Sequence, residues 1–151
     1  MSDDQSGKKP VHTPMLGDFA NVTRDKLRYG DTDRQGHVNN AVFATFLETG
    51  RVNMLFGGEV DLAGPNGAFV LARLELDYRA EVNWPGEVWI GTNIASLGRS
   101  SLRLEQAVFQ NGECVASGVS IVVLTDITTR RSKPFSDEAR ISLLAQLTPD
   151  A

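Results

Sequence analysis

The alternation of apolar and charged residues is clearest from Val70 to Arg79, where every second side chain is apolar. A period of two is typical of a strand with one face buried, here carrying Val70, Ala72, Leu74, Leu76 and Tyr78. The same alternation returns in three later stretches, 88–94, 102–108 and 114–125. Turn residues separate them, including Asn111-Gly112, a strong hairpin signal. The second half of the chain therefore predicts four antiparallel strands, and a weaker alternation over 24–29 predicts one earlier strand.

Residues 41–56, AVFATFLETGRVNMLF, have a different pattern, in which apolar residues occupy most positions around a helix. Gly57 and Gly58 follow as helix-ending residues. We expect a long central helix that is buried on most of its sides. One strand before this helix and four after it, without parallel strand–helix–strand units, predict an α+β fold in which one twisted sheet packs on the helix.

The two ends of the chain have weaker patterns. Residues 1–20 are polar and interrupted by proline, so we predict a mobile tail there and a single domain over 21–151. Ser136 is a suitable N-cap for a short helix over 137–147. Open sheet edges predict self-association.

Composition narrows the possible functions. The chain of 151 residues contains 41% hydrophobic and 23% charged residues, as expected for a soluble globular protein, and has no apolar run long enough for a membrane span. The N-terminus lacks an apolar secretion signal, so we expect a cytoplasmic protein. A net charge of −4 argues against general nucleic-acid binding. The single Cys114 excludes an internal disulfide, and we interpret it as a core residue.

The candidate chemistry lies in residues 29–40, YGDTDRQGHVNN, directly before the predicted helix. The first amides of a helix are unpaired and its dipole is positive there, so this stretch suits an anion or a polarised carbonyl group. Asp31 and Asp33 could supply a base or nucleophile, or they could be turn and capping residues. Asn39 or Asn40 could be the helix N-cap.

Other chemistries have little support. The stretch begins like a calcium loop, but Val42 stands where that loop needs a glutamate. Asp31, Asp33 and His37 are too few for a convincing metal site, and we expect no metal and no cofactor. The glycine-rich motifs of dinucleotide and P-loop sites and the nucleophile elbow are absent from the sequence.

Residues 29–51, YGDTDRQGHVNNAVFATFLETGR, resemble the active-site loop and central helix of hotdog-fold acyl-CoA thioesterases of the 4-hydroxybenzoyl-CoA thioesterase family. The order of elements agrees over about residues 22–135. The resemblance implies a hotdog fold, with an antiparallel sheet wrapped around one long helix. It also implies that Asp33 is the catalytic nucleophile or general base, that the backbone amide of Asn40 polarises the thioester carbonyl, and that His37 and Asn39 shape the loop.

One departure of this sequence from the family's motif concerns the substrate. Family members that act on hydroxybenzoyl-CoA carry an aromatic residue at the position of Asn40 and Pro-Ala-Gly after the aspartate, whereas this chain has Arg34-Gln35-Gly36. The difference indicates the branch that acts on fatty or general acyl-CoA.

The resemblance further implies an acyl-CoA substrate and a homodimer, often paired into a homotetramer, with sites at the subunit boundary. The phosphates of coenzyme A suit arginine and hydroxyl side chains, and the candidates are Arg99, Ser100, Ser101, Arg130 and Arg131. Each arginine could equally be an ordinary surface charge. The alternatives are an acyl-carrier-protein thioesterase, a hotdog dehydratase, or a non-catalytic acyl-CoA-binding subunit.

Overall fold

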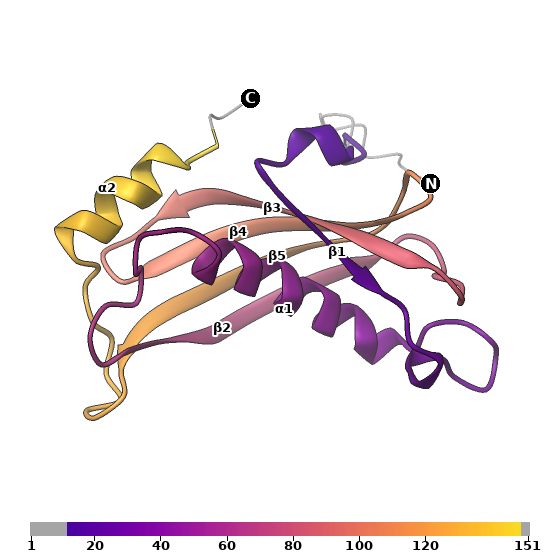
Figure 1. Ribbon diagram of the computed structural model, residues 1–151, viewed down its shortest axis with the longest axis horizontal. Coiled ribbons are helices and arrows are strands. Elements are labelled where there is room, and N and C mark those ends of the chain that lie inside the picture. Colours follow the sequence, from indigo (N-terminus) through magenta and orange to yellow (C-terminus); the bar gives the residue numbers. More distant parts are fainter. Residues whose placement is uncertain (1–11, 149–151) are drawn as a thin grey trace, which may run out of the picture.

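Five antiparallel strands form one sheet in the order β1-β3-β4-β5-β2, in agreement with the predicted number of strands (Figure 1). The computed structural model describes residues 12–148. The strands are β1 (Asn21–Lys26), β2 (Gly67–Tyr78), β3 (Glu87–Leu97), β4 (Ser101–Gln110) and β5 (Glu113–Asp126). Two α-helices, α1 (Asn40–Phe56) and α2 (Asp137–Ala145), and two short 3-10 helices, η1 (Leu16–Asp18) and η2 (Tyr29–Asp31), complete the fold. Within the described residues, no helix is long and apolar enough to span a membrane.

Helix α1 lies across one face of the sheet (Figure 1). It begins after Asn39, whose side-chain oxygen accepts a hydrogen bond from the Ala41 amide at 3.0 Å, so Asn39 is the N-cap. Phe43, Phe46 and Leu47 are buried, but Val52 is 49% exposed and Phe56 is 60% exposed. The prediction of burial on most sides is therefore wrong for a single chain, because the sheet covers only one side of the helix.

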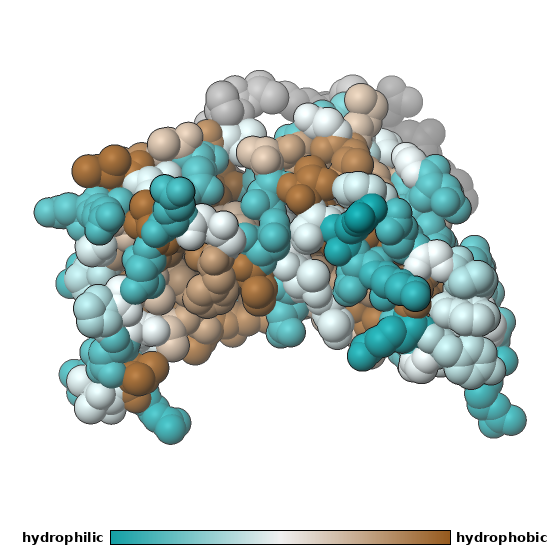
Figure 2. Space-filling view, in the orientation of Figure 1, coloured by the Kyte–Doolittle hydropathy of each residue, from teal (hydrophilic) through white to brown (hydrophobic). Residues whose placement is uncertain are grey.

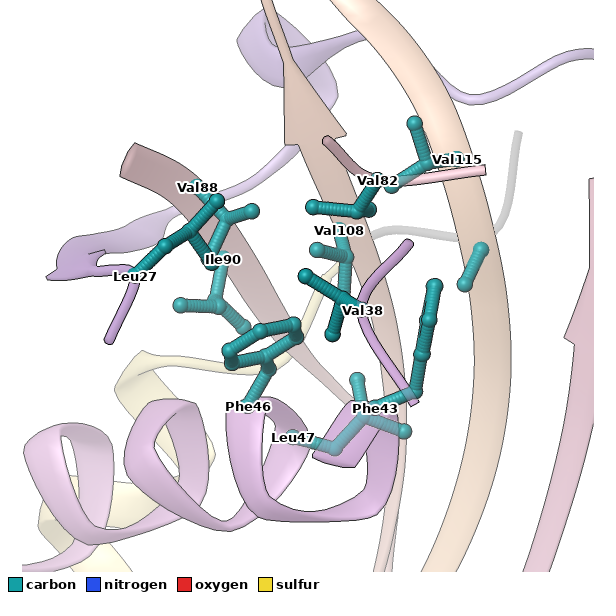
Figure 3. Packing of buried hydrophobic residues seen from close by; sticks show 11 residues of the cluster. Leu27, Val38, Phe43, Phe46, Leu47, Val82, Val88, Ile90, Val108 and Val115 are labelled. Carbon is teal, nitrogen blue, oxygen red and sulfur yellow. The ribbon is translucent and has the colours of Figure 1, made fainter. Parts of the chain in front are cut away.

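Two apolar clusters lie between α1 and the sheet. We call the one under the first half of α1 the N-terminal core; Figure 3 shows Phe43 and Phe46 of the helix among the valine and isoleucine side chains of this cluster. The C-terminal core includes Met54 and Leu55 of α1 and Leu143 of α2. The side chains that define both cores are buried.

A polar layer of Gly50, Arg51, Thr92, Gln106 and Ser120 separates the two cores along the helix and strands. The Gln106 side-chain amide donates to the Leu47 carbonyl and to the Thr92 hydroxyl, both at 2.9 Å. Arg51 is only 6% exposed and donates to Gln106 at 3.4 Å. Burial lowers the pKa of the Arg51 guanidinium, while the nearby Glu48 carboxylate acts in the opposite direction.

Two differences from the predicted strands have physical causes. Strand β1 ends before Leu27, because this side chain turns into the N-terminal core and its amide donates to the Gly86 carbonyl at 2.9 Å. A bulge in β2 between Leu71 and Arg73 places Val70 on the opposite face from Leu74, so the predicted five-residue apolar face is broken.

The predicted tail over 1–20 lies partly outside the described residues. Inside them, Leu16 and Phe19 pack against Phe109 and Ala107 of β4. Phe19 also lies over Gly91, where an added Cβ would come within 2.4 Å of its ring. Residues 16–19 are therefore packed on the sheet. The sequence did not predict this contact, because one aromatic residue over a glycine leaves no periodic signal.

Candidate active site

The loop before α1 is closed by its own backbone. The Asp33 amide donates to the His37 carbonyl at 2.9 Å, and the Gly36 amide donates to the Asp33 carbonyl at 3.2 Å. Gly36 has φ of 86°, a left-handed conformation that glycine adopts without strain. The Val38 amide donates to the Val82 carbonyl at 2.9 Å, so the loop is fixed to the connection between β2 and β3.

The two aspartates of the loop have different environments. The Asp31 carboxylate is buried and accepts hydrogen bonds from the Arg28 amide at 2.9 Å and the Arg28 guanidinium at 3.1 Å, so it has a structural role. The Asp33 carboxylate is half-buried, and its Oδ1 accepts the Gln35 amide at 2.9 Å. Its Oδ2 has no hydrogen-bond partner within residues 12–148. Only the second aspartate therefore has an oxygen available for chemistry.

The amides at the start of α1 are nearly all occupied. The Val38 amide donates to Val82, Asn39 to the Asp31 carbonyl, Ala41 to the Asn39 side chain, and Val42 to the Asn39 carbonyl. Within the described chain, the Asn40 amide alone of these five has no partner. A single free N–H group thus remains at the positive end of the helix.

A cavity of about 550 Å³ brings these groups together. Its polar lining includes Asp33, His37, Asn40 and Glu81, and its apolar lining comprises Val38, Phe43, Tyr78 and Ala80. A somewhat larger hollow of about 630 Å³ lies on the opposite face of the sheet. Its lining includes Asp18, Glu75, Asp77 and Glu105, which makes it unsuited to a phosphate-bearing ligand.

Two side chains that reach the cavity from outside the loop and carry polar groups, Tyr78 and Glu81, were not predicted as site residues. The Tyr78 hydroxyl donates to the Asn40 carbonyl at 3.0 Å, and its ring meets Phe43 edge-to-face with centroids 5.2 Å apart. Glu81 Oε2 lies 3.1 Å from His37 Nε2. Both residues reach the loop because the chain folds back after β2, which sequence spacing does not reveal. The only available signal was Tyr78, an aromatic residue at the end of an alternating strand.

The predicted phosphate-binding residues lie at the other end of the sheet. Strand pairing places Ser101 opposite Val123, the Ser100 carbonyl accepts the Leu124 amide at 2.7 Å, and the Phe135 amide donates to the Arg99 carbonyl at 3.1 Å. Arg130 and Arg131 belong to the turn after β5, at the left of Figure 1, whereas the Asp33 loop lies at the right. One chain therefore does not bring these five residues to Asp33. Within residues 12–148, no group of three or more His, Cys, Asp or Glu side chains is arranged to hold a metal ion.

Comparison with known proteins gives the family. A family model described as the thioesterase-like superfamily matches residues 27–147. The chain belongs to the thioesterase-like superfamily. The comparison with curated proteins finds no match.

Several solved structures are similar to this thioesterase-like chain. A protein from Pseudomonas aeruginosa strain PAO1 is 28% identical with a TM-score of 0.79, covering 91% of this chain and 98% of its own. A predicted thioesterase from Bacillus stearothermophilus is 28% identical with a TM-score of 0.78, covering 87% and 98%. A thioesterase from Thermus thermophilus, solved in complex with coenzyme A and Zn, is 35% identical with a TM-score of 0.72, covering 83% and 98%. The family and these structures confirm the predicted hotdog fold and the class of thioester hydrolase.

Proposed function

We propose that this thioesterase-like protein hydrolyses an acyl-CoA to a free carboxylic acid and coenzyme A. The observation that carries the proposal is that the free Asn40 amide and the free Oδ2 of Asp33 belong to residues that line the same cavity. The likeness to a thioesterase solved with coenzyme A supports the choice of thioester.

In the proposed mechanism, Asp33 attacks the thioester carbonyl carbon or takes a proton from the attacking water. The Asn40 amide donates to the carbonyl oxygen as negative charge develops on it, and the positive end of α1 adds to this stabilisation. The hydrogen bonds of Asn39 and His37 hold the amide and the carboxylate in place. The apolar wall of Val38, Phe43, Tyr78 and Ala80 takes the acyl group.

A homodimer fits the free surface of the chain. β2 is an edge strand, and Val70, Leu71 and Tyr78 on it are 46%, 47% and 53% exposed. Figure 2 shows apolar side chains left of centre, over the C-terminal part of α1 and the adjoining stretch of β2. Pairing of β2 with the β2 of a second copy would cover this surface and the open edge.

The same dimer accounts for the separation of the candidate residues. If two copies of β2 pair antiparallel, the Tyr78 end of one strand lies beside the Gly67 end of the other. Register places Gly67 opposite Asp126, so the turn with Arg130 and Arg131 belongs to that end. Each Asp33 would then face the arginines of the partner, and coenzyme A would lie across the boundary. Pairing of two such dimers into a homotetramer is part of the same proposal.

The first experiment is a thiol-release assay with short, medium, long and aromatic acyl-CoAs. We expect Asp33→Asn to lower kcat by at least about a hundredfold, because the catalytic group is lost while the fold is retained. Asp61→Asn, an exposed carboxylate outside the cavity, is the matched control. Equal activity of wild type and Asp33→Asn would refute the role of Asp33.

A subunit-mixing experiment tests the shared site. Chains that carry Asp33→Asn are unfolded together with chains that carry Arg130→Ala/Arg131→Ala, and the mixture is refolded. Each variant alone should be inactive. Half of the dimers should be mixed, and each mixed dimer has one intact site, so about a quarter of wild-type activity should return. Absence of any recovery, with dimers present by light scattering, would refute a site built from two chains.

A further inference from the structure

We infer that the outer face of the sheet, which is turned away from α1, binds the same face of a second copy of this chain. The contact surface is a block of side chains on the neighbouring strands β2, β5 and β4, which we call the outer patch. Its members are Arg73 and Glu75 of β2, Val119 and Ile121 of β5, and Arg103 and Glu105 of β4. None of them lines the cavity that holds Asp33. The inference therefore does not need the proposed hydrolysis, and it identifies the face through which the proposed dimers join into a tetramer.

Strand register arranges the outer patch in two rows. Side chains of residues directly opposite each other in an antiparallel pair point to the same face of the sheet. Ile121 lies between two such partners, Arg73 and Arg103, and together they form an arginine row. Val119, two residues earlier on β5, has a glutamate opposite it on each side, and this is the glutamate row. The outer patch thus has an apolar middle, one positive end and one negative end.

The outer patch is open to solvent in a single chain. Its arginine and glutamate side chains are exposed, and Val119 and Ile121 are partly exposed. The other face of the same strands is buried, with Leu104 of β4 and Val122 of β5 in the C-terminal core. Strand β5 therefore carries apolar side chains on both faces, as expected of a strand that is covered on both sides.

The order of the charges makes the outer patch complementary to itself. Two sheets that pack face to face keep their strand directions within about 30° of each other. A two-fold axis that runs across the strands between the two rows reverses the order of the rows in the second copy. The arginine row of each copy then lies over the glutamate row of the other, and Ile121 lies over the second copy's Val119.

This exchange of partners costs the single chain little. Within residues 12–148, the ion pair found in the outer patch joins Arg73 to Glu75 along β2. The side chains of this pair are 67% and 55% exposed, and such exposed pairs contribute little to stability. Both groups are therefore available to a second copy, where they would be removed from solvent.

The hollow of about 630 Å³ on this face fits the arginines of the second copy. Its lining includes Val119, Glu75 and Glu105 of the outer patch, and it is made more acidic by Asp77 and Asp18. No arginine or lysine among the described residues lines it. In the face-to-face arrangement, the arginine side chains of the second copy enter the hollow, fill it with their apolar stems and bring the opposite charge.

The same axis is compatible with edge-to-edge pairing of β2. It crosses β2 at Leu74, between the two rows and near the middle of Gly67–Tyr78. The two-fold axis between two antiparallel copies of β2 is perpendicular to the sheet and passes near the middle of the strand. Perpendicular two-fold axes that meet generate a closed tetramer, so the face contact and the edge contact can form in one particle.

Charge reversal on β4 tests the face contact without changing the β2 edge. Arg103→Glu and Glu105→Arg each place like charges against each other across the two-fold axis, so either substitution alone should break the contact. A mixture of the two variants restores opposite charges, and so does the double variant Arg103→Glu/Glu105→Arg within one kind of chain. Lys26→Glu on β1 and Glu113→Arg at the start of β5 are matched controls, because both residues are exposed and lie outside the outer patch. Thermal unfolding of every variant checks that the fold is intact.

The readout is the mass of the particle, measured by light scattering after size exclusion at low ionic strength. We expect wild type and the controls to be tetramers and each single reversal to halve the mass. The mixture and the double variant should return to tetramers. A dimeric wild type whose single reversals are monomers would also support the face contact, and would instead refute the pairing of β2.

Two results would overturn the inference. The first is a single reversal that keeps the mass of wild type, which would leave the outer patch to a partner of another kind. The second is a mixture that stays at half the mass, because the loss would then not come from the charge pattern. Thiol release measured on the same samples reports on the proposed hydrolysis separately, so an inactive protein leaves the mass measurement to decide the face contact.

Discussion

Gly50 marks the closest approach of α1 to the sheet, and its replacement by alanine gives a sharp test of the packing. A Cβ at this position would lie 2.5 Å from the Ile90 Cγ2, 2.8 Å from the Gln106 Nε2 and 3.0 Å from the Thr92 Oγ1. Carbon atoms normally meet at roughly 3.5–4.0 Å, so the helix would have to move by about 1 Å.

Two opposing effects set the magnitude. Alanine is favoured over glycine inside a helix by about 1 kcal/mol, while forcing a methyl group into a packed core typically costs about 1–3 kcal/mol. The upper part of that range applies here, because the movement also disturbs the hydrogen bonds of Gln106 to Leu47 and Thr92. We therefore expect Gly50→Ala to lower the free energy of unfolding by about 1–2 kcal/mol.

The assay is urea unfolding at one fixed protein concentration, because self-association would make the midpoint depend on concentration. Thr45→Ala, on the exposed side of the same helix, is the control and should be neutral or slightly stabilising. If Gly50→Ala is as stable as wild type or more so, helix propensity outweighs the contact and the argument from close packing is wrong.

Two further predictions concern titratable groups. Hydrogen bonds from the Thr129 amide, the Asn66 side chain and the Thr128 amide lower the pKa of Asp126 below its ordinary 3.8. The stabilisation by this carboxylate is therefore present above pH 3.8 and is lost as the pH falls through the lower pKa of the folded state. The difference in urea midpoint between wild type and Asp126→Ala should shrink in acid. A difference that stays constant with pH would contradict this prediction. Burial raises the pKa of the Cys114 thiol, so less of the reactive thiolate is present near neutral pH. An aromatic disulfide reagent should then modify the folded protein at least about tenfold more slowly than the urea-unfolded chain. Equal rates would show that the thiol is accessible.

Local patterns predicted the elements well where each residue's role depends on its neighbours in sequence. The alternation of strands and the glycines after Phe56 define elements that the structure contains. The bulge at Ala72 was not predictable, because one extra residue in β2 is accommodated by its pairing with β5 rather than by its own sequence. The packing of Phe19 on Gly91 likewise depends on a contact between residues far apart in the chain.

The candidate site was predictable to a similar extent. The run before α1 indicated a carboxylate beside a helix start, and the resemblance selected Asp33. Sequence reasoning treated several amides near the helix start as unpaired, whereas the fold occupies those of Val38 and Ala41. The contacts of Glu81 and Tyr78 with the loop arise from the return of the chain after β2, which is a property of the tertiary fold.

The polar layer across the middle of the helix–sheet contact has a consequence for how this protein can change. Because Gln106 and Arg51 stand between the two cores, a substitution in one core is separated from the other by hydrogen-bonded groups rather than by shared apolar contacts. Substitutions in the two halves should then combine additively, without the coupling expected for neighbours. The half that holds the cavity could thus be remodelled for a new acyl group, by selection or by design, while the arginine-bearing end keeps its packing.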